Sequence, residues 1–340
     1  MTPHFLPNLV NRSFGDPGVY LDFLFERRAI LFDLGDLAPL APRKLLRISD
    51  VLISHTHIDH FIGFDTLLRI LLGREKSLRL FGPPGFLRQL ESRLASYSWN
   101  LVGSYPCEFR VVGHELHPDG RVLAAGFSSR RAFAREDDSE GAFEDGLILN
   151  EADFQLRVAF LEHSLPCLAF AFQEKRHVNF MKNRLEELGA PVGPWLSEVK
   201  GAVLRDAPDH TLIRVAPGGK GLPEEMVFTL GELKERVLEL VPGEKVAYVT
   251  DTAYTPENCR RIVELAQGAD YFFIEATFLD ADRERAADRA HLTARQAGEL
   301  ARAAGAARVI PFHFSPRYLG REHELRREVQ EAFQGDPAER

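Results

Sequence analysis

Cysteine is scarce in this chain, and long apolar runs are missing. The three cysteines, Cys107, Cys167 and Cys259, are far apart and form no C-x-x-C pair. This spacing argues against a disulfide framework or a thiolate zinc knuckle, and it fits a reducing cytoplasm. No run approaches the roughly 20 apolar residues that span a bilayer, and the start of the chain lacks a basic segment followed by an apolar one. We therefore expect a cytoplasmic protein with no membrane partner.

Positive charge is also in short supply. The 340 residues include 42 Lys and Arg against 50 Asp and Glu, which gives a formal net charge of −8 at pH 7. Such a charge repels polyanions on average, so a nucleic-acid partner would have to be met by a local basic face. Hydrophobic residues make up 45% of the chain, which is enough for one large packed domain or two modest ones.

What the sequence does contain is a cluster of metal-ligand residues. His55, His57, Asp59 and His60 directly follow the apolar run 51–53, which is typical of a short buried strand. Alternate residues of such a turn point different ways, so His55 and His57 can hold one ion while Asp59 and His60 face a second. Imidazole and carboxylate without thiolate favour zinc or a similar ion in an open, catalytic site. The alternative is a metal-free group of surface histidines, which rarely gathers four ligand-type residues at this spacing.

The pattern His-x-His-x-Asp-His after an apolar strand resembles the metallo-β-lactamase superfamily. This resemblance implies an α/β (α+β) fold, an αββα sandwich in which two mixed β-sheets are flanked by helices. The alternation of strands and helices, with polar residues at strand ends, predicts the same layers. Within this fold, we expect residues 130–145 to form an exposed charged loop. Lactonases, thioesterases, nucleases and sulfatases all carry the motif, so it does not identify the reaction.

Three more polar residues, His163, Asp251 and His313, each follow a predicted strand, and strand ends are where open α/β sheets build sites. Two ions held ~3.5–4 Å apart normally share a bridging carboxylate, and Asp251 is the natural bridge. We expect two Zn²⁺, with Mn²⁺ or Fe as alternatives, and a metal-bridging hydroxide that Asp59 orients or whose proton it accepts. The expected metal ligands are His55, His57, Asp59, His60, His163, Asp251 and His313. Ordinary surface or structural roles are expected for His4, His114, His117, His210 and His323.

Residues 173–243 differ in composition from the rest, with many prolines and glycines and a basic opening. We expect them to form an inserted arm or cap on a hydrolase domain made of residues 1–172 and 244–340, with helices at 179–188 and 230–240. A long insertion in a compact domain is usually functional, and a disordered surface excursion is the alternative. The arm is expected to project from the domain as an RNA-binding exosite. The residues expected to grip a polyanion there are Lys175, Arg176, Lys182 and Arg184.

Several short motifs, in order along the chain, resemble ribonuclease Z, the tRNA 3′-processing branch of the superfamily. They are residues 81–85, 163–166, 188–194, 250–252, 274–277, 291–294 and 313–318. The resemblance implies that Glu275 hydrogen-bonds His291 and holds it as the imidazolium that protonates the departing 3′-oxygen. A carboxylate behind a histidine does raise its basicity, while the alternatives are that His291 caps the following helix or ligates a metal. The resemblance also implies a substrate contact by Arg317 and a homodimer whose arm serves the partner's active site.

Two enzymatic functions and one non-enzymatic function remain open on the sequence alone. The first is a dinuclear zinc phosphodiesterase of ribonuclease Z type, an endoribonuclease acting on a tRNA precursor or another phosphodiester. The second is a hydrolase of the same fold acting on a small ester, a lactone or a cyclic or aryl phosphodiester. The pair Glu275 and His291 favours the first, whereas the net charge and an arm that diverges from the family after Trp195 favour the second. The third is an RNA-binding or scaffold protein with a dead site, which the complete ligand set disfavours.

Overall fold

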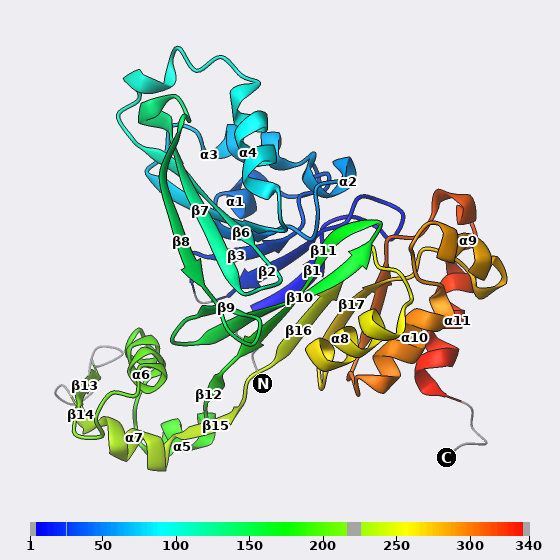
Figure 1. Cartoon of the computed structure of the whole chain (residues 1–340). Coiled ribbons are helices and arrows are strands. Elements are labelled where there is room, and N and C mark those ends of the chain that lie inside the picture. Colours follow the sequence, from blue (N-terminus) through cyan, green and yellow to red (C-terminus); the bar gives the residue numbers. More distant parts are fainter. Residues whose placement is uncertain (1–4, 25, 216–225, 336–340) are drawn as a thin grey trace. The chain divides into compact units, whose positions relative to one another are not determined.

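The computed structural model describes residues 5–24, 26–215 and 226–335, and these fall into two compact units (Figure 1). The larger is called the hydrolase unit and consists of the described residues of Phe5–Ile148, Leu156–Phe172 and Lys245–Arg340. The smaller is called the arm unit and consists of the described residues of Leu149–Gln155 and Gln173–Glu244. Within the described ranges, no helix has the length and apolarity that a membrane crossing requires.

The first sheet of the hydrolase unit follows the order of the chain from edge to edge. Its strands are β1 (Phe5–Leu9), β2 (Val19–Phe23), β3 (Ala29–Phe32), β4 (Ile48–Leu52), β5 (Lys76–Gly82), β6 (Phe109–Leu116), β7 (Arg121–Ser128) and β8 (Arg135–Ala142). Strands β3 to β6 pair in parallel, whereas β1 and β2 on one side and β7 and β8 on the other pair antiparallel. The sheet is therefore mixed, as predicted.

Short helices cover one face of this sheet. They are α1 (Pro42–Leu45), α2 (Ile58–Phe61), α3 (Phe64–Leu71), α4 (Phe86–Ala95), η1 (Val102–Ser104) and η2 (Ser129–Arg131). Leu67 and Leu71 of α3 and Leu90 of α4 are fully buried in one apolar cluster with Val51 and Leu80 of the sheet. Each such leucine stabilises the fold by about 1.5–3 kcal/mol, so these helices hold the end of β4, and the loop that follows it, in place.

The second sheet has the order β18-β17-β16-β11-β10-β9. Its strands are β9 (Leu147–Asn150), β10 (Phe154–His163), β11 (Leu165–Glu174), β16 (Lys245–Val249), β17 (Tyr271–Glu275) and β18 (Val309–Phe312). The helices that follow these strands are α8 (Pro256–Ala266), η3 (Asp280–Asp282), α9 (Arg283–Asp288), α10 (Ala294–Ala303), η4 (Pro316–Tyr318) and α11 (Glu322–Gln334). Strands β16, β17 and β18 pair in parallel, so their carboxyl ends lie at one edge of the sheet.

Aromatic side chains fill the space between the two sheets. Phe5 of the first sheet packs edge-on against Phe172 of the second, with ring centroids 4.8 Å apart. Phe32 contacts Tyr248 at 5.4 Å, and Tyr248 in turn stacks on Phe312 at 5.3 Å. Each sheet thus buries one face against the other sheet and the opposite face against helices. The predicted αββα sandwich is confirmed.

The arm unit packs around an apolar cluster of its own, which includes Trp195, Val199 and Leu233. The unit contains two antiparallel strand pairs. They are β12 (Arg176–Phe180) with β15 (Leu238–Pro242) and β13 (Leu212–Val215) with β14 (Met226–Thr229). Its helices are α5 (Lys182–Glu187), α6 (Trp195–Leu204) and α7 (Leu230–Arg236). The described part of residues 173–243 is therefore folded, whereas its role as an RNA-binding arm stays a prediction.

Three local predictions were wrong because strand pairing overrides local pattern. Residues 130–145 contain the strand β8, whose mostly exposed charged residues protect a sheet edge from further pairing. The predicted helices at 179–188 and 230–240 are shorter, because the ends that β12 and β15 occupy pair with each other. Helix α6 was not predicted at all.

Candidate metal centre

The predicted ligands meet at the carboxyl ends of strands from both sheets. The stretch from His55 to His60 follows β4 of the first sheet, and His163 ends β10 of the second. Asp251 and His313 lie just beyond β16 and β18. These strands belong to one folded unit, so the backbone itself brings the distant segments together.

One set of candidate ligands, called the first group, consists of His55, His57, His163 and Asp251, whose ligand atoms all lie within 4.8 Å of one another. Asp251 is central to it: its Oδ2 atom is 3.6 Å from Nε2 of His55 and 3.5 Å from Nε2 of His163. The ring of His57 lies 4.4 Å from that of His55 between centroids. This arrangement is open on the side of His57, which is exposed.

A second set, called the second group, consists of Asp59, His60 and His313, again within 4.8 Å of one another. Nε2 of His313 is 3.3 Å from Oδ2 of Asp59. Asp251 contacts this group too, with Oδ2 3.4 Å from Nε2 of His60 and Oδ1 3.0 Å from Nδ1 of His313. One buried carboxylate therefore faces both groups, as the predicted bridge requires.

The hydrogen bonding of the histidine nitrogens also indicates that these residues fit divalent ions. Nε2 of His55, Nε2 of His60 and Nδ1 of His313 are buried and have no hydrogen-bond partner. Leaving a buried polar atom unsatisfied costs about 1–3 kcal/mol, and a cation between these nitrogens and the carboxylates would remove that cost. The set of imidazole nitrogens and carboxylate oxygens suits zinc and its neighbours in the first transition row.

The pKa values of these groups follow from burial and from their mutual charges. Burial lowers the pKa of His55 to about 2, and the adjacent His60 adds to this. Burial would also lower the pKa of His60, but the carboxylates of Asp251 and Asp33 outweigh it and raise this pKa to about 10. Burial would raise the pKa of Asp251, but His313 and His60 hold it well below its usual range. Asp251 is thus ionised at pH 7, and an ion that binds His60 must displace a proton.

Sequence reasoning missed two residues at this centre, Asp33 and Tyr248. Oδ2 of Asp33 is 2.9 Å from Nδ1 of His60 and accepts a hydrogen bond from the hydroxyl of Tyr248 at 2.7 Å. A bond to the outer nitrogen of a histidine leaves its other nitrogen free to face a metal. The signal for Asp33 was present, because it is an acidic residue directly after the apolar strand β3. Tyr248 gave no signal, because it lies inside the apolar strand β16.

The backbone is strained at the same strand ends. Asp33, Asp251 and His313 adopt left-handed conformations with φ of 55°, 40° and 58°. This region costs roughly 1–2 kcal/mol for a residue with a Cβ atom, and such strain gathers at functional sites. It turns each side chain away from the strand direction and toward the centre.

Glu275 and His291 form a hydrogen-bonded pair next to Asp251 and His313, and one ligand atom of each of these four residues lies within 4.8 Å of the others. Oε2 of Glu275 is 2.8 Å from Nδ1 of His291, and Glu275 also accepts from the backbone N–H of Thr252 at 2.7 Å and the hydroxyl of Thr277 at 2.5 Å. Burial would lower the pKa of His291, but the charge of Glu275 outweighs it and the pKa is raised. Helix α10 is capped by Thr293, whose side chain accepts from Gln296 N–H. His291 is therefore not the helix cap.

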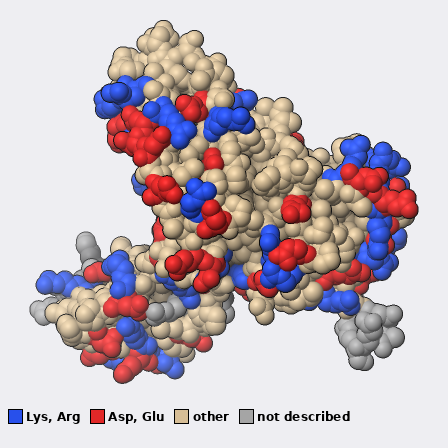
Figure 2. Space-filling view, in the orientation of Figure 1, with Lys and Arg blue, Asp and Glu red and all other residues tan. Residues whose placement is uncertain are grey.

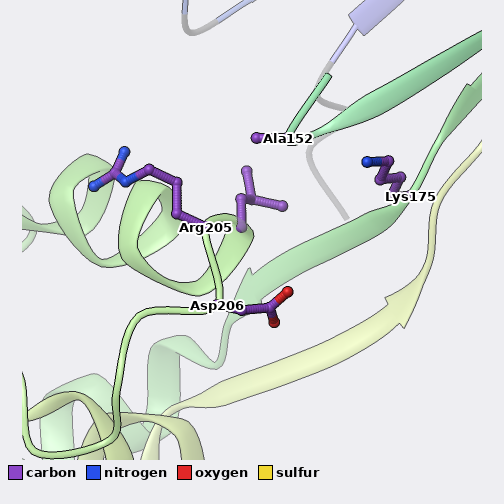
Figure 3. Close-up of a pocket in the computed structure, with 5 residues that line it drawn as sticks. Ala152, Lys175, Arg205 and Asp206 are labelled. Carbon is purple, nitrogen blue, oxygen red and sulfur yellow. The ribbon is translucent and has the colours of Figure 1, made fainter. Parts of the chain in front are cut away.

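The residues predicted to contact substrate are divided between the two units, with Arg317 in the hydrolase unit and the others in the arm unit. Arg317 is exposed in η4, where its Nε is 3.6 Å from Asp282. Lys182 and Arg184 are exposed on α5 of the arm unit, and the side chain of Arg176 lies outside what the structure describes. Lys175 lines a cavity of about 390 Å³ within the arm unit (Figure 3). The other residues lining this cavity are Ala152, Leu204, Arg205 and Asp206.

Among the described residues, the histidines predicted to be ordinary belong to none of the candidate ligand groups. His114 stacks on Phe81 with ring centroids 4.6 Å apart, and Nε2 of His117 is 3.1 Å from Glu115. His210 and His323 are exposed. His4 lies outside the described residues.

Comparison with known proteins places the fold and the centre in a class. A family model described as "Beta-lactamase superfamily domain" matches residues 21–141 and 236–314. The metallo-β-lactamase fold protein YhfI of Bacillus subtilis superposes with a TM-score of 0.55 at 15% identity, over 97% of this chain and 93% of that one. The class is therefore the β-lactamase superfamily, in agreement with the predicted fold.

The curated relatives are more specific. Ribonuclease Z of Deinococcus radiodurans is 29% identical over 294 residues, which cover 85% of this chain and 83% of the relative. Ribonuclease Z of Porphyromonas gingivalis is 30% identical over 277 residues, which cover 80% of this chain and 73% of the relative. The chain belongs to the ribonuclease Z family within this superfamily, and it is a metal-dependent hydrolase of that type.

Proposed function

We propose that the chain is a dinuclear zinc endoribonuclease that hydrolyses a phosphodiester bond of tRNA precursors. The observation that carries this proposal is the pair of Glu275 and His291, held 2.8 Å apart beside both ligand groups. Carboxylic esters and lactones can be opened by a metal centre alone, whereas an alkyl phosphodiester also needs a proton for its leaving oxygen. Relatives named ribonuclease Z support the same reading.

The residues of the first and second groups would hold the two ions, with Asp251 between them. Bound there, the ions would lower the pKa of a water molecule toward neutrality and neutralise charge on the phosphoryl oxygens. Asp59 suits the task of orienting the attacking water or accepting its proton. Burial would raise the pKa of Asp59, but its contact with His313 and the charge of His60 lower it to about 2, so it is ionised at neutral pH.

His291 would act on the leaving group of the reaction, the ribose 3′-oxygen. As the oxygen of the water forms its bond to phosphorus, the bond from phosphorus to the ribose 3′-oxygen breaks. The proton of the His291 imidazolium passes to that oxygen, which leaves as a 3′-hydroxyl. Glu275 holds the ring in position and favours its charged form, since its own oxygens are fixed by Thr252 and Thr277.

Binding of a long RNA would use surfaces beyond the centre. Figure 2 shows basic and acidic side chains interspersed on the visible face, so contacts with RNA on that face would be local rather than made along one basic stripe. We assign the grip on RNA to residues 173–243, with Lys175, Arg176, Lys182 and Arg184 as phosphate contacts, and a further contact to Arg317. We also propose a homodimer in which the arm of one protomer serves the active site of its partner.

The alternative is a hydrolase of a small ester, a lactone or a cyclic or aryl phosphodiester, and the net charge of −8 favours it. One experiment with purified, zinc-loaded protein distinguishes the two functions. A tRNA precursor with a 3′ extension, bis(p-nitrophenyl) phosphate and a panel of lactones are offered in parallel. Cleavage of the precursor at a single position supports the proposal. Turnover of a lactone or of the aryl ester with an intact precursor would support the alternative.

A further inference from the structure

A buried polar cluster lies behind the candidate ligands and consists of Asp33, Ser54 and Tyr248. All three are fully buried. They come from different places in the sandwich, since Asp33 follows β3, Ser54 follows β4 and Tyr248 lies in β16 of the other sheet. Asp33 accepts from the backbone N–H of Ser54 at 2.7 Å, from the Ser54 hydroxyl at 2.8 Å and from the Tyr248 hydroxyl at 2.7 Å. The two sheets are thus linked by one carboxylate.

This cluster reaches one histidine from each ligand group. Nδ1 of His60 is 2.9 Å from Oδ2 of Asp33, and Nδ1 of His55 is 3.1 Å from Oγ of Ser54. When Nε2 of a histidine binds an ion, the ring proton is on Nδ1. His60 then donates to Asp33, whereas His55 donates to the oxygen of Ser54, whose own proton goes to Asp33. The Ser54 oxygen is also 3.2 Å from Nδ1 of His60, a longer approach than that of Asp33.

Tyr248 is held so that its hydroxyl points at the cluster. Its ring lies between Phe32, at 5.4 Å, and Phe312, at 5.3 Å between centroids. Counting His60, Oδ2 of Asp33 faces three donors and Oδ1 accepts from one. Loss of the Tyr248 hydroxyl would remove one of the three groups that hold Oδ2 in place and let the carboxylate turn away from His60.

We propose that Tyr248 is a positioning residue that acts through Asp33 on the ion of the second group, while Ser54 serves mainly the ion of the first group through His55. This inference rests on the metal ligands proposed above. It predicts that the two ions respond differently to substitutions behind them. Partners of this kind change metal affinity by about 10–100-fold.

The test uses two backgrounds that each keep one ion. His57→Ala removes a ligand of the first group alone, and Asp59→Ala removes a ligand of the second group alone. Zinc affinity of the remaining ion is measured by competition with a chromophoric chelator. Tyr248→Phe should weaken zinc binding by ~10-fold or more in the His57→Ala background and leave it unchanged in the Asp59→Ala background. Ser54→Ala should have its larger effect in the Asp59→Ala background.

Tyr20→Phe is the matched control. Tyr20 is also a fully buried tyrosine whose hydroxyl donates one hydrogen bond, to the carbonyl of Lys44 at 3.0 Å, and it lies in β2. A merely structural role would make the two substitutions equivalent, so equal zinc affinities for Tyr248→Phe and Tyr20→Phe, or equal losses in both backgrounds, would overturn the inference. Failure of the ligand assignment itself is seen separately, because His57→Ala or Asp59→Ala would then still bind two ions.

Discussion

His163 is tied to the backbone next to His291. Its Nδ1 atom is 2.7 Å from the carbonyl oxygen of Ala290, and the two imidazole rings lie 4.7 Å apart between centroids. A candidate ligand of the first group thus also fixes the segment that carries the proposed acid. In the proposed mechanism, this short contact would couple the position of a metal ligand to that of the proton donor.

His291→Ala should separate substrates by their leaving group. A ribose 3′-alkoxide needs a proton as it leaves, whereas p-nitrophenolate does not. We expect RNA cleavage to fall by ~10²–10⁴-fold and turnover of bis(p-nitrophenyl) phosphate to fall much less. Glu275→Gln should give a weaker form of the same selectivity, because the hydrogen bond survives but the charge is lost. Equal losses on both substrates, or release of metal from the alanine variant, would show instead that His291 is a ligand.

Asp251→Ala should empty both metal positions. Oδ2 of the carboxylate faces His55 and His163 of the first group and His60 of the second, and Oδ1 faces His313 of the second. Elemental analysis of the purified variant should find neither ion, with Asp288→Ala, which removes an exposed carboxylate, as a control that retains both. Retention of two ions would mean that the bridge is assigned to the wrong residue.

Zinc binding should release protons and strengthen as pH rises. The pKa of His60 is raised to about 10 by Asp251 and Asp33 despite its burial, so its protonated form dominates below that pH and competes with the ion. Where one proton is displaced, the affinity rises about tenfold per pH unit until the pH nears that value. Calorimetry in buffers of different ionisation enthalpy counts the protons released. A proton count of zero at pH 7 would contradict the assignment of His60.

Removing charge from the arm should affect large substrates only. Lys182 and Arg184 are exposed on α5, so replacing both by alanine would remove the proposed phosphate contacts without disturbing the apolar cluster of the arm unit. We expect weaker binding of the tRNA precursor, a shallower dependence of binding on salt and unchanged turnover of bis(p-nitrophenyl) phosphate. Deleting residues 173–243 should abolish RNA cleavage in the same selective way. Equal loss on both substrates would show that the segment is needed for folding.

Light scattering tests the proposed homodimer. A particle of twice the 38.3 kDa chain mass is expected. Mixing a His291→Ala protomer with one that lacks residues 173–243 should then restore RNA cleavage. In the mixed dimer, the arm of the first protomer would serve the intact active site of the second. A monomer in solution, or no complementation, would count against the exchange of arms.

The sequence alone determined the features that local chemistry encodes. His55, His57, Asp59 and His60 lie within six residues, so their shared role could be read from spacing. The later candidates could be found because each follows an apolar run. The alternation of strands and helices was enough to predict the layers of the fold.

Only the tertiary structure decided the contacts between segments that are distant in the sequence. Tyr248 and Asp33 are 215 residues apart in the chain, and no local pattern distinguishes that tyrosine from its apolar neighbours in β16. The charged segment at 135–142 became an edge strand because β7 offered it backbone partners. Periodicity reports which face of an element is buried, but the partner on that face is selected by packing between segments that are distant in sequence.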